Sequence, residues 1–469
     1  MRVPFPTIPV SNGEWLPLPV TRHQRAVSQR IADEMGRGAR RHGMTRAEFL
    51  RTTAATATAF WVLNESRGLA STGDTAVLPI PTPLREDPAA GAALLDAKKF
   101  FVIDVQQHHV DLKTFGASAS NFCFLRFLST AACAADPSQL GQLNYIKEVF
   151  VDSETDIGVI SGLPAGVPMG PAAMAETGRL VNQLAGARRA VWQAVCDPTF
   201  PRNAPTGIDS LEYQIKTLKA RALKCYTYSG NWRLDDEQVA YPMLDRASKL
   251  GIRLINVHKG LPAMFAPGSP ESVRTTDFPK VVQDWPHLKF CAYHSGYFQA
   301  GTHPAGKEGI SEFLEMIATI PEKRRRNVYA EIGSTFAILI AQPDHAAHFL
   351  GQLLQALGPR NVLWGTDSIW WGSPQYLIDA FKLLTIPPAM QAQFGYPPLD
   401  DRTKARILGQ NAARLYGLKG KDFARLPADR LQQVQQEQGG LRAARSLRVY
   451  GAQTRRQFFS QFGRNPLRG

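Results

Sequence analysis

The sequence predicts an α/β protein whose main part, residues 100–418, is a closed (β/α)8 barrel of the TIM type. Eight short apolar runs rich in β-forming residues recur along this region, and stretches of helical period separate them. Apolar strands that alternate with helices indicate a parallel sheet covered on both faces. An open doubly wound sheet is the alternative, but the first run leads into VQQHHVD, without a glycine-rich nucleotide fingerprint.

The expected strands are listed here in chain order: FFVIDV (100–105), DIGVIS (156–161), RAVWQAV (189–195), ALKCYT (222–227), RLINV (253–257), KFCAY (289–293), NVYAEI (327–332) and NVLWGT (361–366). Amphipathic helices are expected between them. DDEQVAYPMLDRASKLG (235–251) is an example, because it opens on acidic residues and ends at a glycine, as helices commonly do.

The two ends of the chain lie outside this pattern. We predict an N-terminal helical or irregular extension (residues 1–68) and a linker rich in Ala, Gly, Pro and Thr (69–99). The barrel (100–418) follows, and a basic helical C-terminal tail (419–469) ends the chain.

The formal net charge of +14 is concentrated in the flanks. Residues 1–99 hold 13 Lys+Arg and 9 Asp+Glu, residues 100–418 hold 30 and 28, and residues 419–469 hold 11 and 3. Nucleic-acid binding would require basic residues clustered with aromatic ones on a recognition element. The arginines of LRAARSLRVYGAQTRRQ (441–457) fit a solvated helical face instead, so we expect no nucleic-acid partner.

Residues 40–60, RRHGMTRAEFLRTTAATATAF, are similar to a twin-arginine export signal. The second arginine of the expected pair is Ala47, however, and some forty residues precede the motif. The alternative is an amphipathic helix packed on the domain surface. A working signal would place the protein in the periplasm, and the alternative leaves it in the cytoplasm.

No apolar run reaches the roughly eighteen residues that a membrane-spanning helix needs, so no membrane span is expected. The five cysteines form neither a CxxC pair nor an even set, and we expect them to be buried thiols. They are Cys123, Cys133, Cys196, Cys225 and Cys291.

Polar residues stand at the carboxyl ends of several expected strands, where a barrel of this type carries its chemistry. These residues are Asp104, Gln106, His108 and His109 on strand one, Lys224 on strand four, His258 on five, His294 on six, Glu331 on seven and Asp367 on eight. Imidazoles and a carboxylate suit a divalent metal ion that keeps one coordination position open. A histidine outside the coordination sphere can move protons.

Residues 100–418 resemble the metal-dependent amidohydrolase superfamily, in the amidohydrolase-related branch that includes aminocarboxymuconate-semialdehyde decarboxylase. The resemblance rests on the D-x-x-x-H of strand one and on four segments. These are LGIRLINVHKG, KFCAYHSG, NVLWGTDS and the closing KARILGQNAARLYGL (404–418). The order and spacing of these segments match the superfamily over about two thirds of the chain.

The resemblance implies a mononuclear metal site held by His108, His258 and Asp367. The family usually shows H-x-H after strand one, so Gln106 stands in the place of the first ligand. The resemblance implies one divalent ion, Zn²⁺, with Mn²⁺ as the alternative. An amide oxygen is a weaker donor towards zinc than imidazole or carboxylate, so Gln106 leaves open a looser site, a different metal or the loss of the metal. His294 matches the family's catalytic histidine after strand six, and Asp367 is expected to take part in catalysis as well.

Three residues are candidates for contact with the substrate. Arg126 in CFLRF could grip a carboxylate bidentately, and a surface arginine is the equally weighted alternative. Neighbouring residues at a strand end point in opposite directions, so His109 is expected behind the ligands or facing the substrate. Trp370, with Trp371 beside it, would form the wall of an aromatic substrate site or would cap the barrel.

Further roles are expected for buried charged residues. Asp104 and Glu331 are predicted to support the residues that contact the metal. Lys224 could be a modified bridging ligand, as in binuclear relatives, but the branch is usually mononuclear.

The first functional hypothesis is a metal-dependent hydrolase that acts on a small cyclic ester, amide or related carbonyl compound through metal-activated water. The alternative is non-oxidative decarboxylation of an aromatic or unsaturated carboxylic acid. A third hypothesis, supported by Gln106, is a catalytically silent barrel that serves as a binding module. The expected partner is a small-molecule substrate, and the sequence leaves open whether the protein forms a homo-oligomer.

Overall fold

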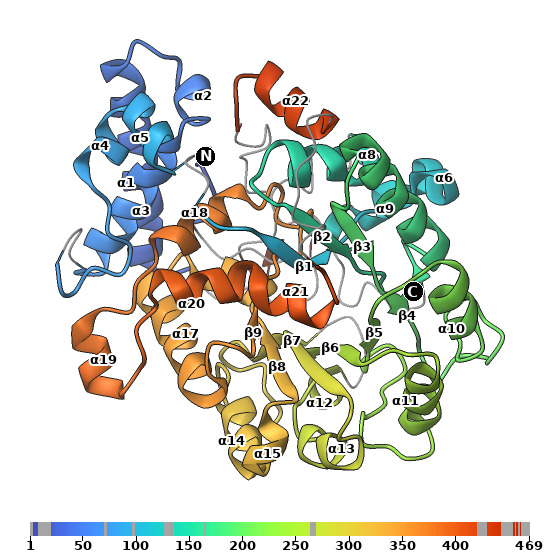
Figure 1. The fold of residues 1–469 in the computed structure, drawn as a ribbon. Helices are drawn as coiled ribbons and strands as arrows, with labels where there is room; N and C mark the ends of the chain where they lie inside the picture. Colours follow the sequence, from blue (N-terminus) through green and yellow to red (C-terminus); the bar gives the residue numbers. More distant parts are fainter. Residues whose placement is uncertain are drawn as a thin grey trace.

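The computed structural model describes residues 3–7, 20–69, 73–95, 99–125, 133, 136–163, 166–262, 269–419, 429–441, 454, 456, 457 and 460. Parallel strands occupy its centre, helices surround them, and a group of N-terminal helices lies on one side (Figure 1). The predicted fold class, an α/β barrel with helical parts towards both ends of the chain, is confirmed.

Each of the eight predicted runs contains a strand. The strands are β1 (Ile103–Gln107), β2 (Ile157–Ile160), β3 (Ala190–Trp192), β4 (Ala194–Val195), β5 (Leu223–Tyr226), β6 (Leu254–Gly260), β7 (Lys289–Tyr297), β8 (Val328–Glu331) and β9 (Val362–Leu363). Gln193 alone separates β3 from β4, so the nine labelled strands form eight strands of the barrel. All the pairings are parallel, in the orders β1-β2-β3 and β4 through β9.

Contacts between β1 and the segment that begins at β9 close the barrel. The Val105 N–H donates to Trp364 O at 3.0 Å. Gln107 forms a parallel bridge with Ser368. The first and eighth strands of the ring are therefore neighbours, as a closed barrel requires.

Helices cover the outside of the barrel. The longer ones are α9 (Pro171–Ala185), α11 (Ala240–Lys249), α13 (Phe278–Asp284), α14 (Ser311–Thr319), α16 (Gly333–Leu339), α17 (Pro343–Leu357) and α18 (Gln375–Leu383). The helix expected at 235–251 is α11, and it begins later than its acidic residues suggest. Asp236 instead accepts hydrogen bonds from the backbone N–H groups of Gln238 and Val239 in a preceding turn.

Short helices complete the region. They are α6 (Leu112–Phe115), α8 (Gln142–Ile146), α10 (Ser210–Glu212), α12 (Ser269–Ser272), α15 (Glu322–Arg325), α19 (Pro388–Phe394), α20 (Asp401–Ala405) and α21 (Asn411–Leu415). The segment 404–418, which carries part of the family resemblance, includes α21 and packs against β1 and β9. A Cβ at Gly409 would lie 2.3 Å from Phe101 O, so this close approach requires glycine.

Five helices form the N-terminal part, shown in blue in Figure 1. They are α1 (Arg22–Arg41), α2 (Arg46–Phe49), α3 (Thr53–Ser66), α4 (Thr82–Glu86) and α5 (Pro88–Leu95). The apolar segment of the signal-like stretch is α3. Its side chains are buried on nearly all sides, so it is an internal helix of this part and not an amphipathic surface helix. Export of the chain stays a prediction.

The N-terminal part is fixed to the barrel region by polar contacts. Arg67 pairs with Asp344 on α17, with 2.7 Å between Nε and Oδ1. The Thr385 N–H donates to Val77 O at 2.8 Å. The segment expected as a linker (69–99) contains α4 and α5, and the boundaries at residues 68, 99 and 418 stay predictions.

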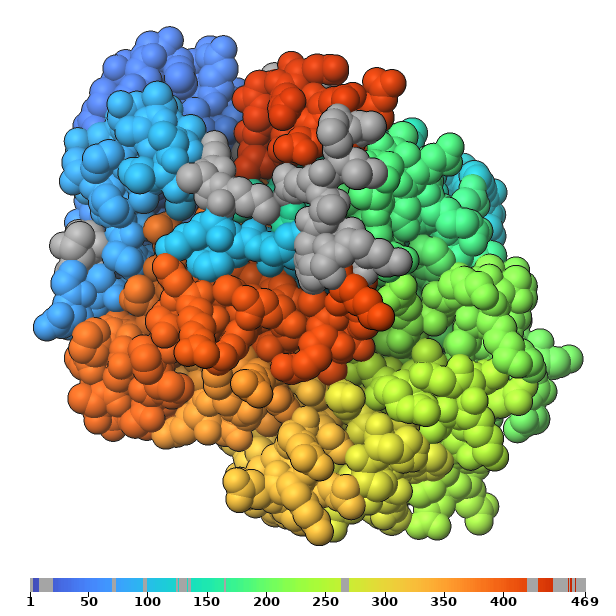
Figure 2. Space-filling model, in the orientation of Figure 1, coloured from blue at the N-terminus to red at the C-terminus, as the bar shows by residue number. Residues whose placement is uncertain are grey.

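The C-terminal tail contributes α22 (Arg430–Glu437), which packs on α9. Figure 2 shows it in red between the N-terminal helices and the green part of the barrel. Asp429 caps this helix and also pairs with Arg189, 2.9 Å from Nη1 to Oδ2, with both side chains buried. Most of the expected arginine face in 441–457 lies outside the described residues.

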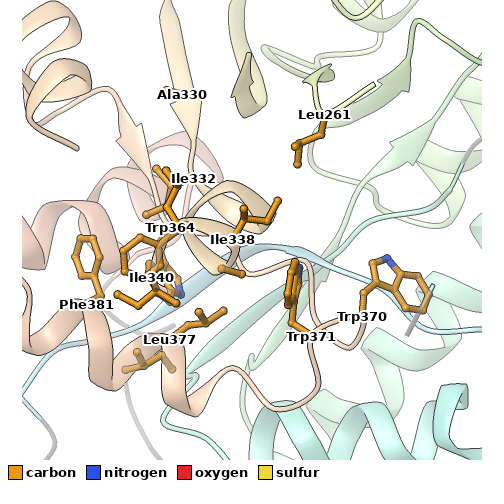
Figure 3. Close-up of a cluster of buried hydrophobic side chains, with 14 of the residues drawn as sticks. Leu261, Ala330, Ile332, Ile338, Ile340, Trp364, Trp370, Trp371, Leu377 and Phe381 are labelled. Atoms are coloured by element: carbon orange, nitrogen blue, oxygen red, sulfur yellow. The ribbon is translucent and has the colours of Figure 1, made fainter. Parts of the chain in front are cut away.

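Apolar side chains fill the barrel and pack between its strands and helices. Inside the barrel lies a plug that includes Ile103, Val105, Val159, Val191, Leu254, Tyr293 and Leu363. Outside it, Trp364 after β9 packs on Phe381 of α18, with ring centroids 5.2 Å apart (Figure 3). Among the described residues, no helix has both the length and the apolar character to cross a membrane.

The cysteine prediction is confirmed for Cys196, Cys225 and Cys291, which are buried thiols. It is wrong for Cys123 and Cys133, which form a disulfide across ten positions of sequence. Both lie in the segment between β1 and β2, outside the strand runs, where local sequence pattern says little about which side chains meet.

Candidate functional site

The polar residues from the strand ends form one connected group at the carboxyl end of the barrel. Asp367 contacts both Gln106, on β1, and His108, just after β1. Its Oδ1 is 3.1 Å from His108 Nε2 and 2.9 Å from Gln106 Nε2. Gln106 Nε2 is 3.5 Å from His294 Nε2. The ring centroids of His294 and His258 are 4.6 Å apart. The structure therefore brings together all five residues of the expected metal and proton-transfer set.

His108 and Asp367 face each other in an arrangement that requires a positive charge. His108 Nδ1 lies 2.7 Å from Ser161 O, and a carbonyl oxygen can only accept, so Nδ1 carries a proton. If the ring is neutral, Nε2 then presents a lone pair to the Asp367 carboxylate. The pair is stable only with a second ring proton or with a metal cation at this place.

Asp367 is held as a carboxylate by its neighbours. Burial alone would raise its pKa, but the hydrogen bond and charge of His108, with the Ser334 hydroxyl, hold the pKa of Asp367 well below its usual range. Ser334 Oγ donates to Asp367 Oδ2 at 2.5 Å, and Trp371 Nε1 donates to Ser334 Oγ at 2.8 Å. Trp371 thus orients the carboxylate through Ser334.

Gln106 carries an unused oxygen at the centre of the site. Its Nε2 donates to Asp367, while its Oε1 is buried and has no hydrogen-bond partner among the residues that the structure describes. Buried polar atoms are normally paired, and each exception calls for an explanation. The oxygen lies on the side of Gly333, where an added Cβ would be 3.1 Å from it, whereas the NH2 group faces Asp367 and His294. The role of Gln106 as a metal ligand stays a prediction.

His258 is neutral and has one ring nitrogen to offer. Its Nε2 lies 3.1 Å from Leu261 O and must donate there, which leaves Nδ1 with the lone pair. Burial, with the charges of His294 and Lys224, lowers the pKa of His258 well below its ordinary value. Neutral imidazole is the form that binds metal ions.

His294 stands in a left-handed backbone conformation, with φ of 65°, and Asp367 in another, with φ of 62°. Such conformations are costly for residues other than glycine and concentrate at functional sites. Burial lowers the pKa of His294 to about 3, so its ring is neutral. Its Nδ1 is buried without a hydrogen-bond partner among the described residues.

Glu331 holds the backbone of His294 in this conformation. Glu331 Oε2 accepts from the His294 N–H at 3.0 Å, and Oε1 accepts from the Gly333 N–H at 2.5 Å. A Cβ at Gly333 or Gly365 would lie 2.5 or 2.0 Å from Glu331 Oε1, so both glycines are needed to seat the carboxyl group. Burial raises the pKa of Glu331, which favours its protonated form.

Asp104 is on β1 and links this first strand of the barrel to the segment that follows the last strand, β9. Its Oδ1 accepts from the backbone N–H groups of Thr366 and Gln106 at 3.0 and 3.1 Å, and its Oδ2 accepts from the Thr366 hydroxyl. Burial raises the pKa of Asp104 to about 7 against these hydrogen bonds. This carboxyl group fixes the backbone on both sides of the expected ligands.

His109, in contrast, does not join the group. Its Nδ1 donates to Val110 O at 3.0 Å, and its Nε2 lies 2.9 Å from the Thr177 hydroxyl on α9. Both ring nitrogens are therefore satisfied away from His108, and burial lowers the pKa of His109 to about 4. These contacts give His109 a role in the fold, and its contact with a substrate stays a prediction.

The other residues expected to contact the substrate are Trp370, with Trp371 beside it, and Arg126. Trp370 stacks on the His108 ring, with centroids 5.6 Å apart and planes 7° from parallel. Trp370 and Trp371 both extend from the segment after β9 (Figure 3). Arg126 lies outside the described residues.

Two further residues contribute to the site without having been predicted from the sequence. Ser334 follows the seventh strand run and acts through its hydroxyl, so a rule that includes every polar residue near a strand end would have found it. Ser161 ends the second run and acts through its backbone carbonyl oxygen, which any residue type supplies, so the side-chain pattern carries no signal for it.

Two donors of the expected metal site lie close together, because His108 Nε2 is 3.1 Å from Asp367 Oδ1. Within the described part of the chain, no three His, Cys, Asp or Glu side chains stand close enough together to hold an ion on their own. The Gln106 Nε2 group, which donates to the same Asp367 oxygen, is not a metal donor, so a ligand role for Gln106 would use its amide oxygen. The assignment of a metal ion to these residues stays a prediction.

Comparisons with known proteins give a family and several similar folds. No curated protein matches the chain. A 5-carboxyvanillate decarboxylase from Sphingomonas paucimobilis is 16% identical over 68% of this chain and 100% of its own, with a TM-score of 0.44. A dihydroxybenzoic acid decarboxylase from a Polaromonas species, solved with bound manganese, is 15% identical over 69% and 99%, with a TM-score of 0.43. A 4-oxalomesaconate hydratase from Rhodopseudomonas palustris is 18% identical over 72% and 99%, with a TM-score of 0.42.

The sequence profile of the amidohydrolase family matches residues 155–418, more than half of the chain. This match confirms the predicted superfamily and, with it, the prediction of an enzyme. It covers β2 through α21 and therefore includes His258, His294 and Asp367, whereas Gln106 and His108 precede it. The chain belongs to the amidohydrolase family.

Proposed function

We propose that the carboxyl end of this barrel binds one divalent metal ion and hydrolyses a small cyclic ester, amide or related carbonyl compound. The observation that carries the proposal is the pair formed by His108 and Asp367. The Ser161 carbonyl oxygen commits one ring nitrogen of His108, so the other faces the Asp367 carboxylate across 3.1 Å, and of a second ring proton or a metal cation at this place we assign the cation.

In this proposal His108, Asp367, His258 and the Gln106 amide would hold the ion, either Zn²⁺ or Mn²⁺. Carboxylate and amide oxygens suit Mn²⁺, and imidazoles suit Zn²⁺. When bound, the ion would polarise a substrate carbonyl and lower the pKa of water.

His294 would take the proton of the attacking water. Its ring is neutral, and neither nitrogen is held by a short hydrogen bond. Glu331 holds the His294 backbone through the N–H group, which fixes the point from which the imidazole extends. Positioned acid–base groups of this kind contribute about 10²–10⁴-fold in rate.

Decarboxylation of an aromatic or unsaturated acid is the second candidate, and the aromatic surroundings of the site favour it. Trp370 stacks on His108, and Tyr228 meets the His258 ring edge-on with centroids 5.0 Å apart. In this case His294 would deliver the proton that replaces the carboxylate as CO₂ leaves.

A panel of lactones and hydroxybenzoates separates the candidates. We expect the purified protein, loaded with Zn²⁺ or Mn²⁺, to release acid from a lactone, with the activity lost on chelation and restored by the metal. Release of CO₂ from a hydroxybenzoate would instead establish the second candidate. Protein that takes up less than one equivalent of either metal and turns over neither class would overturn both and leave the silent barrel.

Metal affinity tests the part assigned to Gln106. We expect Gln106→His to tighten metal binding about tenfold and Gln106→Ala to weaken it modestly, as measured by calorimetric titration of metal-free protein. Gln193→Ala is the control, because this buried carboxamide inside the barrel bonds to Ser161 Oγ and Tyr293 Oη and makes no contact with Asp367. Equal affinities in all four proteins would show that Gln106 is not a ligand.

A further inference from the structure

Two lysines of the barrel are completely buried, and they differ in one respect. Lys259 Nζ donates to Asp277 Oδ2 at 2.6 Å and to Ser272 O at 3.0 Å. Lys224 Nζ has no hydrogen-bond partner among the described residues. Lys259 therefore forms a buried ion pair with Asp277. The ammonium group of Lys224 has no carboxylate in contact with it among the described residues.

Lys224 occupies the floor of the candidate site. It lies on β5, in register with Asn256, and the next inward residue, Tyr226, is in register with His258. Its Nζ sits 3.6 Å from the ring centroid of Tyr293, which belongs to the apolar plug. The ammonium group therefore separates the plug from the metal-binding group above it.

Lys224 interacts electrostatically with this group. Burial lowers the pKa of Lys224, and the carboxyl groups of Glu331 and Asp367 act against that shift. Lys224 in turn lowers the pKa of His258 and of His294. Four residues of the site thus lie within its electrostatic reach, although none is close enough to form an ion pair.

An unpaired buried ammonium is costly to the fold. The desolvation penalty of a buried ion exceeds what a contact with an aromatic face returns. The Asn256 Oδ1 and Gln106 Oε1 atoms are also buried without a hydrogen-bond partner in the described part of the chain. The interior thus holds a donor with three N–H bonds and is incomplete without a ligand.

We propose that Lys224 is the anion anchor of the substrate site and binds a carboxylate group of the substrate. The inference rests on the proposed function, in that the carboxyl end of the barrel must be the substrate site. It adds the substrate class: a small carboxylic acid that presents one negatively charged group to the floor and its reacting group to the metal-binding residues. One ammonium group balances one carboxylate, and Tyr226 and Tyr293 on either side suit a flat organic acid better than a phosphate.

Benzoate and the neutral benzamide are suitable probes, because they share shape and differ in charge. We expect the metal-loaded protein and the metal-free protein both to bind benzoate at least tenfold more tightly than benzamide in calorimetry. Lys224→Met should remove this preference and leave the melting temperature equal or higher, because it removes an unpaired buried charge. Lys224→Gln should also remove the preference for benzoate. This variant replaces Lys224→Met in the test if the methionine variant does not fold.

Lys259→Met is the matched control. It removes the positive charge that pairs with the buried Asp277 and leaves that carboxylate only the hydrogen bond from the Leu234 N–H, so we expect a lower melting temperature and an unchanged preference for benzoate. Retention of the preference in Lys224→Met or Lys224→Gln would overturn the anchor, and so would a melting temperature of Lys224→Met as low as that of Lys259→Met.

The two proposals fail separately. A protein that takes up no metal and hydrolyses nothing, but prefers benzoate through Lys224, would refute the proposed function and support the anchor. Full turnover in Lys224→Met with an uncharged lactone and with its carboxylated analogue alike would refute the anchor and support the function.

Discussion

The two ends of the barrel differ in how far their buried polar groups are hydrogen-bonded. At the amino end, Arg189 lies just before β3 and has every side of its guanidinium engaged. Nη1 pairs with Asp429 at 2.9 Å, Nε donates to Asp156 O at 3.0 Å, and Nη2 donates to Thr155 O at 2.7 Å. At the carboxyl end, Gln106 Oε1, His294 Nδ1 and Lys224 Nζ are buried without hydrogen-bond partners among the described residues.

This difference shows which end is built for stability and which for ligands. A satisfied buried network rigidifies the fold, whereas unsatisfied groups cost stability and are retained where a ligand completes them. Barrels of this type carry their chemistry at the carboxyl ends of the strands. Substitutions at the two ends should therefore change different measurements.

The largest expected effect is on turnover at the carboxyl end. His294→Asn should lower kcat about 10²–10⁴-fold while fold and metal content stay unchanged, because it removes the proton acceptor and not a ligand. His258→Asn should lose both metal and turnover. Metal analysis and steady-state kinetics on the two variants check this. If His294→Asn strips the metal as thoroughly as His258→Asn does, His294 is a ligand.

The next effect is on stability at the amino end. Arg189→Met should lower the free energy of unfolding by about 3–5 kcal/mol, because it leaves Asp429 buried without its partner. Urea unfolding measures the change. Metal affinity of the folded protein should not alter.

Arg202→Met is the control for this variant, since Arg202 pairs with Asp209 on the surface and such pairs contribute about 0–1 kcal/mol. A loss of stability no greater than that of the control would remove the contrast between the two ends.

The smallest expected effect is on stability at acidic pH. It tests whether a single hydrogen-bonded side chain at the carboxyl end, His109, stabilises the fold as the buried groups at the amino end do. His109 is at the carboxyl end but is fully hydrogen-bonded, and burial lowers its pKa to about 4. Unfolded histidine titrates near pH 6.5, so the stability that neutral His109 contributes is complete above about pH 6.5 and is lost as the pH falls towards 4.

His109→Gln removes this one titration and keeps a polar side chain. Between pH 6.5 and 4 the wild type should lose stability faster than the variant, by at most about 1.4 kcal/mol per pH unit. Urea unfolding at several pH values measures the two slopes. Parallel curves would show that His109 titrates normally and is solvated like an exposed residue.

The sequence predicted the strands well because each is a local apolar run, and it predicted the strand-end residues because parallel strands bring their carboxyl ends together. It could not predict which nitrogen of His108 is committed, since that depends on Ser161, 53 positions away. The space for the Glu331 carboxyl group depends on Gly333, two positions away, and also on Gly365, which is distant in the sequence. The burial of α3 likewise depends on distant segments that no local pattern reveals.

The contacts of Arg67 and Thr385 have a consequence during synthesis of the chain. Arg67 meets Asp344, 277 positions later, and the Thr385 hydroxyl meets Ala76 O across 309 positions. Since a ribosome adds about 5–20 residues per second, the N-terminal helices wait roughly 15–60 s for the surface that covers them. Through that interval the N-terminal helices lack the contacts of Arg67 and Ala76 with the later segments. Incompletely packed surfaces of this kind favour aggregation of a nascent chain.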